Sequence, residues 1–199
     1  MRTSRHVQSL QVAPHCGFLP LPSARESGAC RELFATMPAD RKPFRVLFVC
    51  MGNICRSPAA EIVFRHQVNF AGLNDSIHID SAGTIGYHAG KGPDPRMSDT
   101  LRRRGYTIEG RSRQVTPEDL REFDLVLAAD EENLADLRRL DSAGTHLEKI
   151  RLLVEYCVEK EASHVPDPYY GGQRGFEDVA DLVEDACQGL LDSLKRQIG

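Results

Sequence analysis

The sequence contains no long hydrophobic run, no dense set of cysteines and no excess of positive charge. No apolar stretch in its 199 residues approaches the roughly 18 residues that a membrane-spanning helix needs. Six cysteines, at positions 16, 30, 50, 55, 157 and 187, are too few and too scattered for a disulfide framework in a chain of this length. We therefore expect no stable membrane insertion and no disulfide-stapled scaffold.

The sequence also lacks histidines and cysteines paired at the spacing of metal ligands. The seven histidines show no pairing of that kind. A zinc half-site made of Cys50 and Cys55 would need two further ligands, and Cys157 and Cys187 each stand alone. We therefore predict neither a metal ion nor a cofactor.

Charge is unevenly distributed along the chain. The formal net charge is −4, and residues 1–43 carry six Lys/Arg against three Asp/Glu, which leaves −7 for residues 44–199. Nucleic-acid binding needs a positive surface. The acidic body therefore argues against a nucleic-acid partner, although it leaves room for a small positive pocket that binds one phosphate.

Residues 1–43 lack a periodic hydrophobic pattern and are interrupted by proline, so we predict a disordered N-terminal extension. No acidic residue precedes Glu26, a composition weakly typical of a transit peptide. The alternative is an upstream start codon, with Met37 opening the functional chain. The expected location is the cytoplasm, or a plastid or mitochondrion if residues 1–36 are a transit peptide.

From residue 44 to residue 199, strand patterns alternate with helix patterns. Strands are expected at 45–49, 77–80, 125–128 and 149–153, and helices at 58–65, 94–104, from 117, at 131–140 and at 176–198. Ser57 is a suitable N-cap and Pro58 a suitable first residue for the first helix. This alternation predicts one α/β domain with a parallel, doubly wound sheet flanked by helices.

The segment CMGNICRSP, residues 50–58, connects the first strand to the first helix. In such sheets ligands bind beyond the carboxyl ends of the strands, and a helix N-terminus offers free N–H groups to an anion. Gly52 permits close backbone approach, Asn53 tolerates a left-handed conformation, and Arg56 adds a fork of donors that suits phosphate. The segment therefore predicts a phosphate-binding loop after the first strand.

Cys50 stands at the end of the strand, beneath the expected anion. Helix termini and nearby cations favour the thiolate, which is the nucleophilic form of cysteine. Ser57 is placed to donate a hydrogen bond to it. The loop thus joins a nucleophile to a phosphate cradle, whereas the simpler interpretation is a buried cysteine beside a surface arginine.

The loop resembles the Cys-x5-Arg-Ser signature of low-molecular-weight protein tyrosine phosphatases. The likeness continues in order through VLFVCMGNICRSPAAE, DSAGTIGYHAG, RQVTPEDL, AADEENL and DPYYGG, over residues 45–199. It implies a four-stranded parallel sheet and an enzyme that transfers a phosphoryl group to Cys50 and then hydrolyses the phosphocysteine. Its substrates would be phosphotyrosine proteins and small aryl phosphates.

The resemblance also implies a role for individual residues. Arg56 would hold the phosphoryl oxygens, and Asp167, between two prolines, would be the general acid and base. Tyr169 and Tyr170 would wall the cleft, while Tyr87 would either wall it or pack in the core. The expected substrate-binding set is Met51, Gly52, Asn53, Ile54, Cys55, Ser57, Tyr169 and Tyr170.

The sequence does not decide which side chains hold Asn53 in place. Ser81 and Glu61 match family positions that steady this asparagine, but Gly110 stands where animal members have a histidine. Asp130 is expected to be a helix N-cap. Cys55 is either a small buried filler or, as the resemblance implies, a redox partner that protects Cys50.

Three other functions compete with the phosphatase interpretation. An arsenate reductase on this fold uses two further, closely spaced cysteines, which the sequence lacks outside the loop. An arginine phosphatase carries threonine at the position of Ile54. A non-catalytic phosphotyrosine-binding or redox-sensing module would lack the nucleophile or the acid, but both Cys50 and Asp167 are present.

Overall fold

The computed structural model describes residues 42–198. The predicted N-terminal extension lies outside these residues, except for Lys42 and Pro43, and so do Met37 and the segment 1–36. In the described part of the chain no helix is both long enough and apolar enough to cross a bilayer.

Four parallel strands form one sheet in the order β2-β1-β3-β4. The strands are β1 (Phe44–Cys50), β2 (Ile77–Gly83), β3 (Leu125–Ala128) and β4 (Ile150–Leu152). The chain runs from β1 to β2 on one side and later returns to β3 on the other side of β1. The carboxyl end of β1 is therefore the topological switch point of the sheet, where α/β proteins bind ligands. The predicted fold class is confirmed.

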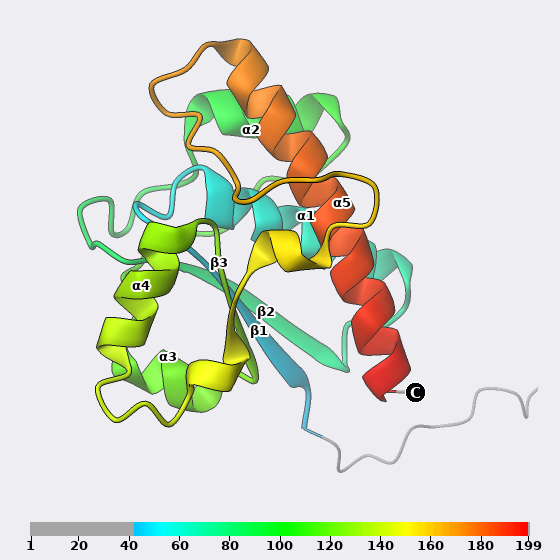
Figure 1. Cartoon of the computed structure of the whole chain (residues 1–199). Helices are drawn as coiled ribbons and strands as arrows, with labels where there is room; N and C mark the ends of the chain where they lie inside the picture. The colour runs from blue at the N-terminus through cyan, green and yellow to red at the C-terminus, as the bar shows by residue number, and fades with distance from the viewer. Residues whose placement is uncertain (1–41, 199) are drawn as a thin grey trace, which may run out of the picture. The chain divides into compact units, whose positions relative to one another are not determined.

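Helices cover both faces of this sheet (Figure 1). The elements are α1 (Arg56–Phe70), α2 (Pro95–Arg103), α3 (Pro117–Glu122), α4 (Glu131–Leu140) and α5 (Gln173–Ile198), with short 3₁₀ turns η1 (Leu147–Lys149) and η2 (Leu153–Tyr156). Successive side chains of a strand point to opposite faces. Val46 and Phe48 thus pack toward α1 and α5, and Leu47 and Val49 pack toward α3 and α4.

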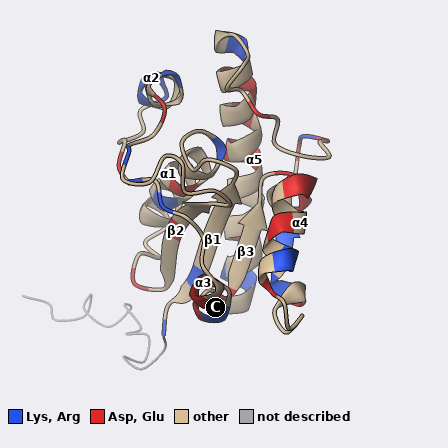
Figure 2. Ribbon diagram, turned by 90° about the vertical axis from the view of Figure 1, so that its left-hand side faces the viewer, with Lys and Arg blue, Asp and Glu red and all other residues tan. Residues whose placement is uncertain are grey.

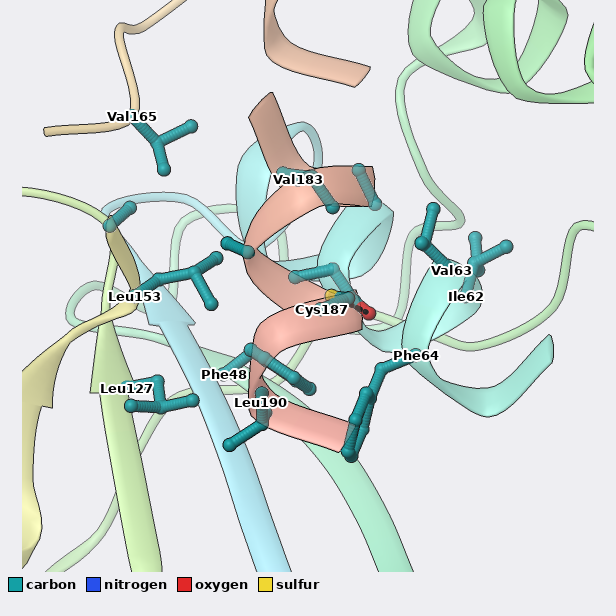
Figure 3. Packing of buried hydrophobic residues seen from close by; sticks show 14 of the residues in the cluster. Phe48, Ile62, Val63, Phe64, Leu127, Leu153, Val165, Val183, Cys187 and Leu190 are labelled. Carbon is teal, nitrogen blue, oxygen red and sulfur yellow. Dashed lines mark hydrogen bonds between the residues drawn. The ribbon is translucent and has the colours of Figure 1, made fainter. Parts of the chain in front are cut away.

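The larger core holds β1 firmly against α1 and α5. Phe48 from β1 and Phe64 from α1 meet edge to face, with ring centroids 5.7 Å apart. Figure 3 shows Leu190 of α5 beside Phe48, and Cys187 between α5 and α1. All four side chains are almost fully buried. Since dense packing leaves a core little freedom to shift, the end of β1, which carries Cys50, has a fixed position.

Several predicted boundaries are wrong by a few residues. Helix α1 begins at Arg56 rather than Pro58 and continues to Phe70, and its N-cap is Cys55 without a side-chain hydrogen bond. Ser57 is not the cap, because its hydroxyl contacts Cys50 and Asn53 instead. Helix α5 begins three residues earlier than predicted, at Gln173, and the last strand shortens to 150–152 because 3₁₀ turns flank it.

Helix α4 follows its sequence signals closely. Asp130 is its N-cap, as predicted, and accepts a hydrogen bond from the N–H of Asn133 at 2.8 Å. Acidic residues occupy the first turn and basic residues the last, an arrangement that complements the helix dipole. In Figure 2 this helix is accordingly red at its beginning, beside the carboxyl edge of the sheet, and blue farther along.

Candidate active site

The carbonyl groups of the loop after β1 point outward. Four of them accept hydrogen bonds from surrounding segments: Cys50 from the N–H of Thr84 (2.9 Å), Met51 from that of Ile85 (3.1 Å), Gly52 from Ser112 Oγ (3.1 Å) and Ile54 from the N–H of Asp94 (2.7 Å). A fifth, that of Cys55, accepts from the N–H of Ala59 in α1 (3.1 Å).

The N–H groups of the same peptides therefore face the interior of the loop. In a trans peptide the N–H points opposite to the C=O, and no described peptide bond is cis. The amides of residues 51–56 donate to no acceptor within residues 42–198. A ring of converging, unused N–H groups at a helix N-terminus is suited to bind a tetrahedral anion such as phosphate.

Asn53 gives the loop its curvature. It has φ +52°, the only positive φ outside glycine in the described chain, which confirms the expected left-handed conformation. Its side-chain amide donates to Ser57 Oγ (3.0 Å) and Ser81 Oγ (2.8 Å), and its Oδ1 accepts from the backbone N–H of Arg113 (2.9 Å). Ser81 in turn donates to Glu61 at 2.6 Å. The N–H of Arg113 is thus one of the groups that hold the Asn53 side chain in place, a contact that the sequence did not reveal.

Arg113 is itself held in place by two carboxylates. Its guanidinium bonds to Asp80 and Asp119, with the shortest contact to each at 2.8 Å. Gly110 lies beside the same group of residues: it adopts φ +97°, and a Cβ atom there would lie 3.7 Å from Glu61 Oε2. Sequence reasoning missed Arg113, which lies in the RQVTPEDL segment, because the bond to Asn53 comes from its backbone rather than from a characteristic side chain.

Cys50 lies at the floor of the loop. Its side chain is 3% exposed, and its Sγ is 3.0 Å from Ser57 Oγ. Ser57 also donates to the carbonyl of Ala82 at 3.2 Å, which keeps its hydroxyl close to the sulfur. The expected contact between Ser57 and Cys50 is therefore present.

Arg56 is a buried cation between two carboxylates. Its side chain is 5% exposed, and it forms ion pairs with Asp130 and, at 3.1 Å, with Asp167. Nη1 also donates to the carbonyl of Val165. Burial lowers the pKa of Arg56, but Cys50, Asp130 and Asp167 outweigh this effect and raise it, so the guanidinium stays charged. Asp130 therefore both caps α4 and pairs with Arg56. The pairing with Arg56 was not predicted from the sequence.

Asp167 reaches the mouth of the loop from a segment far along the chain. The N–H of Val165 donates to the carbonyl of Ala129 at 2.8 Å, which anchors this segment to the end of β3. The N–H of Tyr169 donates to Asp167 Oδ1 at 3.0 Å. The carboxylate is 36% exposed, so it is accessible to a ligand while its orientation is fixed.

A cleft of about 220 Å³ opens above the loop. Its lining residues are Cys50, Met51, Gly52, Ile54, Cys55, Arg56, Ile85, Tyr87, His88, Asp167, Tyr169 and Tyr170. Asn53 and Ser57 are buried beside the loop and do not line the cleft, so their side chains support the loop instead of forming its surface. Ile85 and His88 are additional lining residues that carried no distinct sequence signal.

Tyrosine rings form the walls of this cleft. Tyr87 is 79% exposed and Tyr170 is 91% exposed, so Tyr87 belongs to the cleft and not to the core. Tyr169 and Tyr170 meet edge to face at 5.0 Å. The guanidinium of Arg96 lies 5.1 Å from the ring centroid of Tyr169 and donates to its carbonyl oxygen at 3.0 Å. The walls are suited to an aromatic group above the phosphate site.

The chain resembles proteins of one family along almost its whole described length. The family model "Low molecular weight phosphotyrosine protein phosphatase" matches residues 45–198. A low molecular weight protein-tyrosine-phosphatase from Streptomyces coelicolor is 46% identical over 157 residues, which cover 78% of this chain and 96% of the relative. The low molecular weight phosphotyrosine protein phosphatase of Homo sapiens is 41% identical over 155 residues, covering 77% and 98%. The crystal structure of YfkJ from Bacillus subtilis superposes with a TM-score of 0.75 at 39% identity, covering 80% of this chain and 99% of that one.

Proposed function

Because this chain belongs to the low molecular weight phosphotyrosine protein phosphatase family, we propose that Cys50 is its nucleophile, Arg56 its phosphate clamp and Asp167 its general acid and base. The protein is a cysteine-dependent protein-tyrosine phosphatase. The observation that carries the assignment of residues is the shared cleft: Cys50, Arg56 and Asp167 line it together, above a loop whose N–H groups converge.

The proposed reaction has two steps on the same sulfur. The Cys50 thiolate attacks phosphorus, the bond from phosphorus to the tyrosine oxygen breaks, and Asp167 transfers its proton to the departing oxygen. Water then attacks the phosphocysteine while Asp167 accepts a proton from that water. The P–S bond breaks, which releases inorganic phosphate and restores the thiolate.

The loop and Arg56 stabilise the charge that develops in both steps. The converging N–H groups of the loop are in place before the substrate arrives, so little of the loop has to reorganise, and Arg56 lines the same cleft. Arg56 offers five donors in a planar fork, and the contact with Asp130 holds this fork in place while Asp167 transfers protons. The Ser57 hydroxyl stabilises the thiolate when its single hydrogen turns from the carbonyl of Ala82 to the sulfur, 3.0 Å away.

Hydrolysis of p-nitrophenyl phosphate without added metal tests this proposal directly. The proposed substrates are phosphotyrosine proteins and small aryl phosphates, because the tyrosine walls fit an aromatic ring.

An arsenate reductase would need a second pair of cysteines near Cys50. In the described chain the remaining cysteines are Cys157 and Cys187, and neither lines the cleft.

Cys55 is proposed to protect the nucleophile from permanent oxidation. Burial raises the pKa of the Cys55 thiol, with smaller effects from Asp94 and Cys50, so Cys55 does not compete with Cys50 for the phosphoryl group. Peroxide would oxidise Cys50 to a sulfenic acid, and the Cys55 thiol would then form a disulfide with release of water. Dithiothreitol would reduce that disulfide.

After a brief exposure to hydrogen peroxide, we expect the wild type to regain most of its activity in dithiothreitol. Cys55→Ser should be active before oxidation but recover poorly, because its sulfenic acid is oxidised further. Activity on p-nitrophenyl phosphate before and after treatment measures both effects, and Cys157→Ser serves as the control that recovers normally. Equal recovery of Cys55→Ser and wild type would leave Cys55 as a packing residue.

The catalytic domain is proposed to be independent of residues 1–36. A chain that starts at Met37 is expected to keep kcat/KM within about twofold of the full chain, since β1 begins at Phe44 and all residues lining the cleft follow it. A chain that starts at Phe48 lacks half of β1 and should be inactive. If the chain from Met37 does not fold, the domain boundary is wrong.

We place the protein in the cytoplasm, with a plastid or mitochondrion as the alternative if residues 1–36 are a transit peptide. The support is chemical: the four described cysteines are free thiols, and thiols persist in reducing compartments.

A further inference from the structure

Ser112 contacts the phosphate loop from a segment about 60 residues away. Its hydroxyl donates to the carbonyl oxygen of Gly52 at 3.1 Å, and the side chain is 6% exposed. Among the five outward-pointing carbonyls of the loop, that of Gly52 is the one held by a side chain; the others accept from backbone N–H groups. A single substitution can therefore remove this support without changing the backbone.

The Gly52–Asn53 peptide is the one in the loop whose orientation depends on a positive φ at a residue other than glycine. In its present orientation it requires φ +52° at Asn53, whereas residues other than glycine prefer negative φ. On the other side, Gly52 has no Cβ and so does not resist a change of ψ. A flip of this peptide would direct its C=O, instead of its N–H, at the phosphoryl oxygens.

The position of Ser112 is itself fixed on both sides. Its backbone N–H donates to the carbonyl of Lys91 at 2.8 Å, and its own carbonyl accepts from the N–H of Gly90 at 2.8 Å. The next residue, Arg113, donates its N–H to Asn53 Oδ1 and is tied through its side chain to Asp80 and Asp119. The hydroxyl of Ser112 is thus presented to Gly52 by a rigid segment.

We propose that Ser112 is a positioning residue that keeps the N–H of the Gly52–Asn53 peptide directed at the bound phosphoryl group, and so sets the affinity of the site for phosphate. This inference rests on the proposed function of the loop. Ser112 itself lines no part of the cleft. It acts by giving the Gly52 carbonyl a partner outside the anion site, which a buried carbonyl otherwise lacks.

The test compares Ser112→Ala with the wild type, with inorganic phosphate as a competitive inhibitor of p-nitrophenyl phosphate hydrolysis at 25 °C. We expect the inhibition constant of phosphate to rise about tenfold, equivalent to about 1.4 kcal/mol, and kcat/KM to fall by a similar factor. Ser112→Thr keeps the hydroxyl and should stay within about twofold of the wild type. An inhibition constant does not depend on the amount of active enzyme, so partial unfolding cannot imitate this result.

Ser98→Ala is the matched control. Ser98 is also a buried serine whose hydroxyl contacts a backbone carbonyl, that of Pro93, but this carbonyl lies outside the phosphate loop. Both alanine variants should lose a few degrees of melting temperature, and only Ser112→Ala should bind phosphate more weakly. An unchanged inhibition constant in Ser112→Ala, or an equal loss in Ser112→Thr, overturns the inference. The proposed function fails on a different result, activity that survives Cys50→Ser.

Discussion

Cys50→Ser is expected to abolish hydrolysis of p-nitrophenyl phosphate, with a loss on the order of 10⁶-fold, the scale seen when a covalent nucleophile is removed. A serine hydroxyl in the same position stays protonated, because its acidity is far below that of a thiol, and it also makes a poorer leaving group in the second step. Cys50 is 3% exposed and lines the cleft, with its sulfur beside Ser57, so water cannot take its place easily. Steady-state release of p-nitrophenol measures the effect.

Two further variants separate the loss of the nucleophile from a loss of structure. Cys157→Ser changes a cysteine outside the cleft and should keep normal activity. Cys50→Ser should still bind inorganic phosphate, since the N–H groups of the loop and Arg56 are unchanged. Substantial turnover by purified Cys50→Ser would contradict the phosphocysteine mechanism.

Arg56→Lys is expected to be nearly as damaging as the loss of the nucleophile. A lysine carries the same charge but cannot contact Asp130 and Asp167 and also hold two phosphoryl oxygens, since its ammonium is a single point with three donors. The same assay measures this variant, and Arg121→Lys, on the exposed side of α3, is the control. Near-normal activity of Arg56→Lys would show that charge alone is sufficient.

Asp167→Ala is expected to lose about 10²–10⁴-fold in rate on aryl phosphates with poor leaving groups, and much less on those with good ones. A leaving phenolate of high pKa needs a proton in the transition state, whereas p-nitrophenolate departs without much help. The measurement is kcat/KM over a series of aryl phosphates whose leaving groups differ in pKa, with the slope compared between variant and wild type.

Asp167 also pairs with Arg56, and the control must account for this contact. Arg56 bonds to one carboxylate oxygen of Asp167 and the N–H of Tyr169 to the other, so Asp167→Asn keeps an acceptor for only one of them, and it cannot act as the acid. It should show the same dependence on the leaving group as Asp167→Ala. A uniform loss across the series in both variants would mean that Asp167 orients Arg56 and transfers no proton.

The agreement between sequence and structure is best where local preferences decide the outcome. The alternation of strands and helices predicted the four parallel strands, because a buried strand and an amphipathic helix each have their own hydrophobic period. The residue types of the loop predicted a left-handed Asn53, and Asp130 was correctly identified as the cap of α4. Ser57 was misjudged because two uses of its hydroxyl competed, and the contact with Cys50 and Asn53 prevailed over capping.

The sequence by itself determined the fold class, the phosphate loop and the order of the strands along the chain, since these depend on residues that are neighbours or lie one helical turn apart. Only the tertiary structure decided which distant groups contact that loop. Asp130 on Arg56, Ser112 on Gly52 and the N–H of Arg113 on Asn53 each join segments that are 60 or more residues apart. Such contacts depend on the order of the strands within the sheet, on the direction of each side chain and on which backbone groups are left without a partner. None of these leaves a periodic signal in the sequence, so the supports of the loop become visible only when the chain is folded.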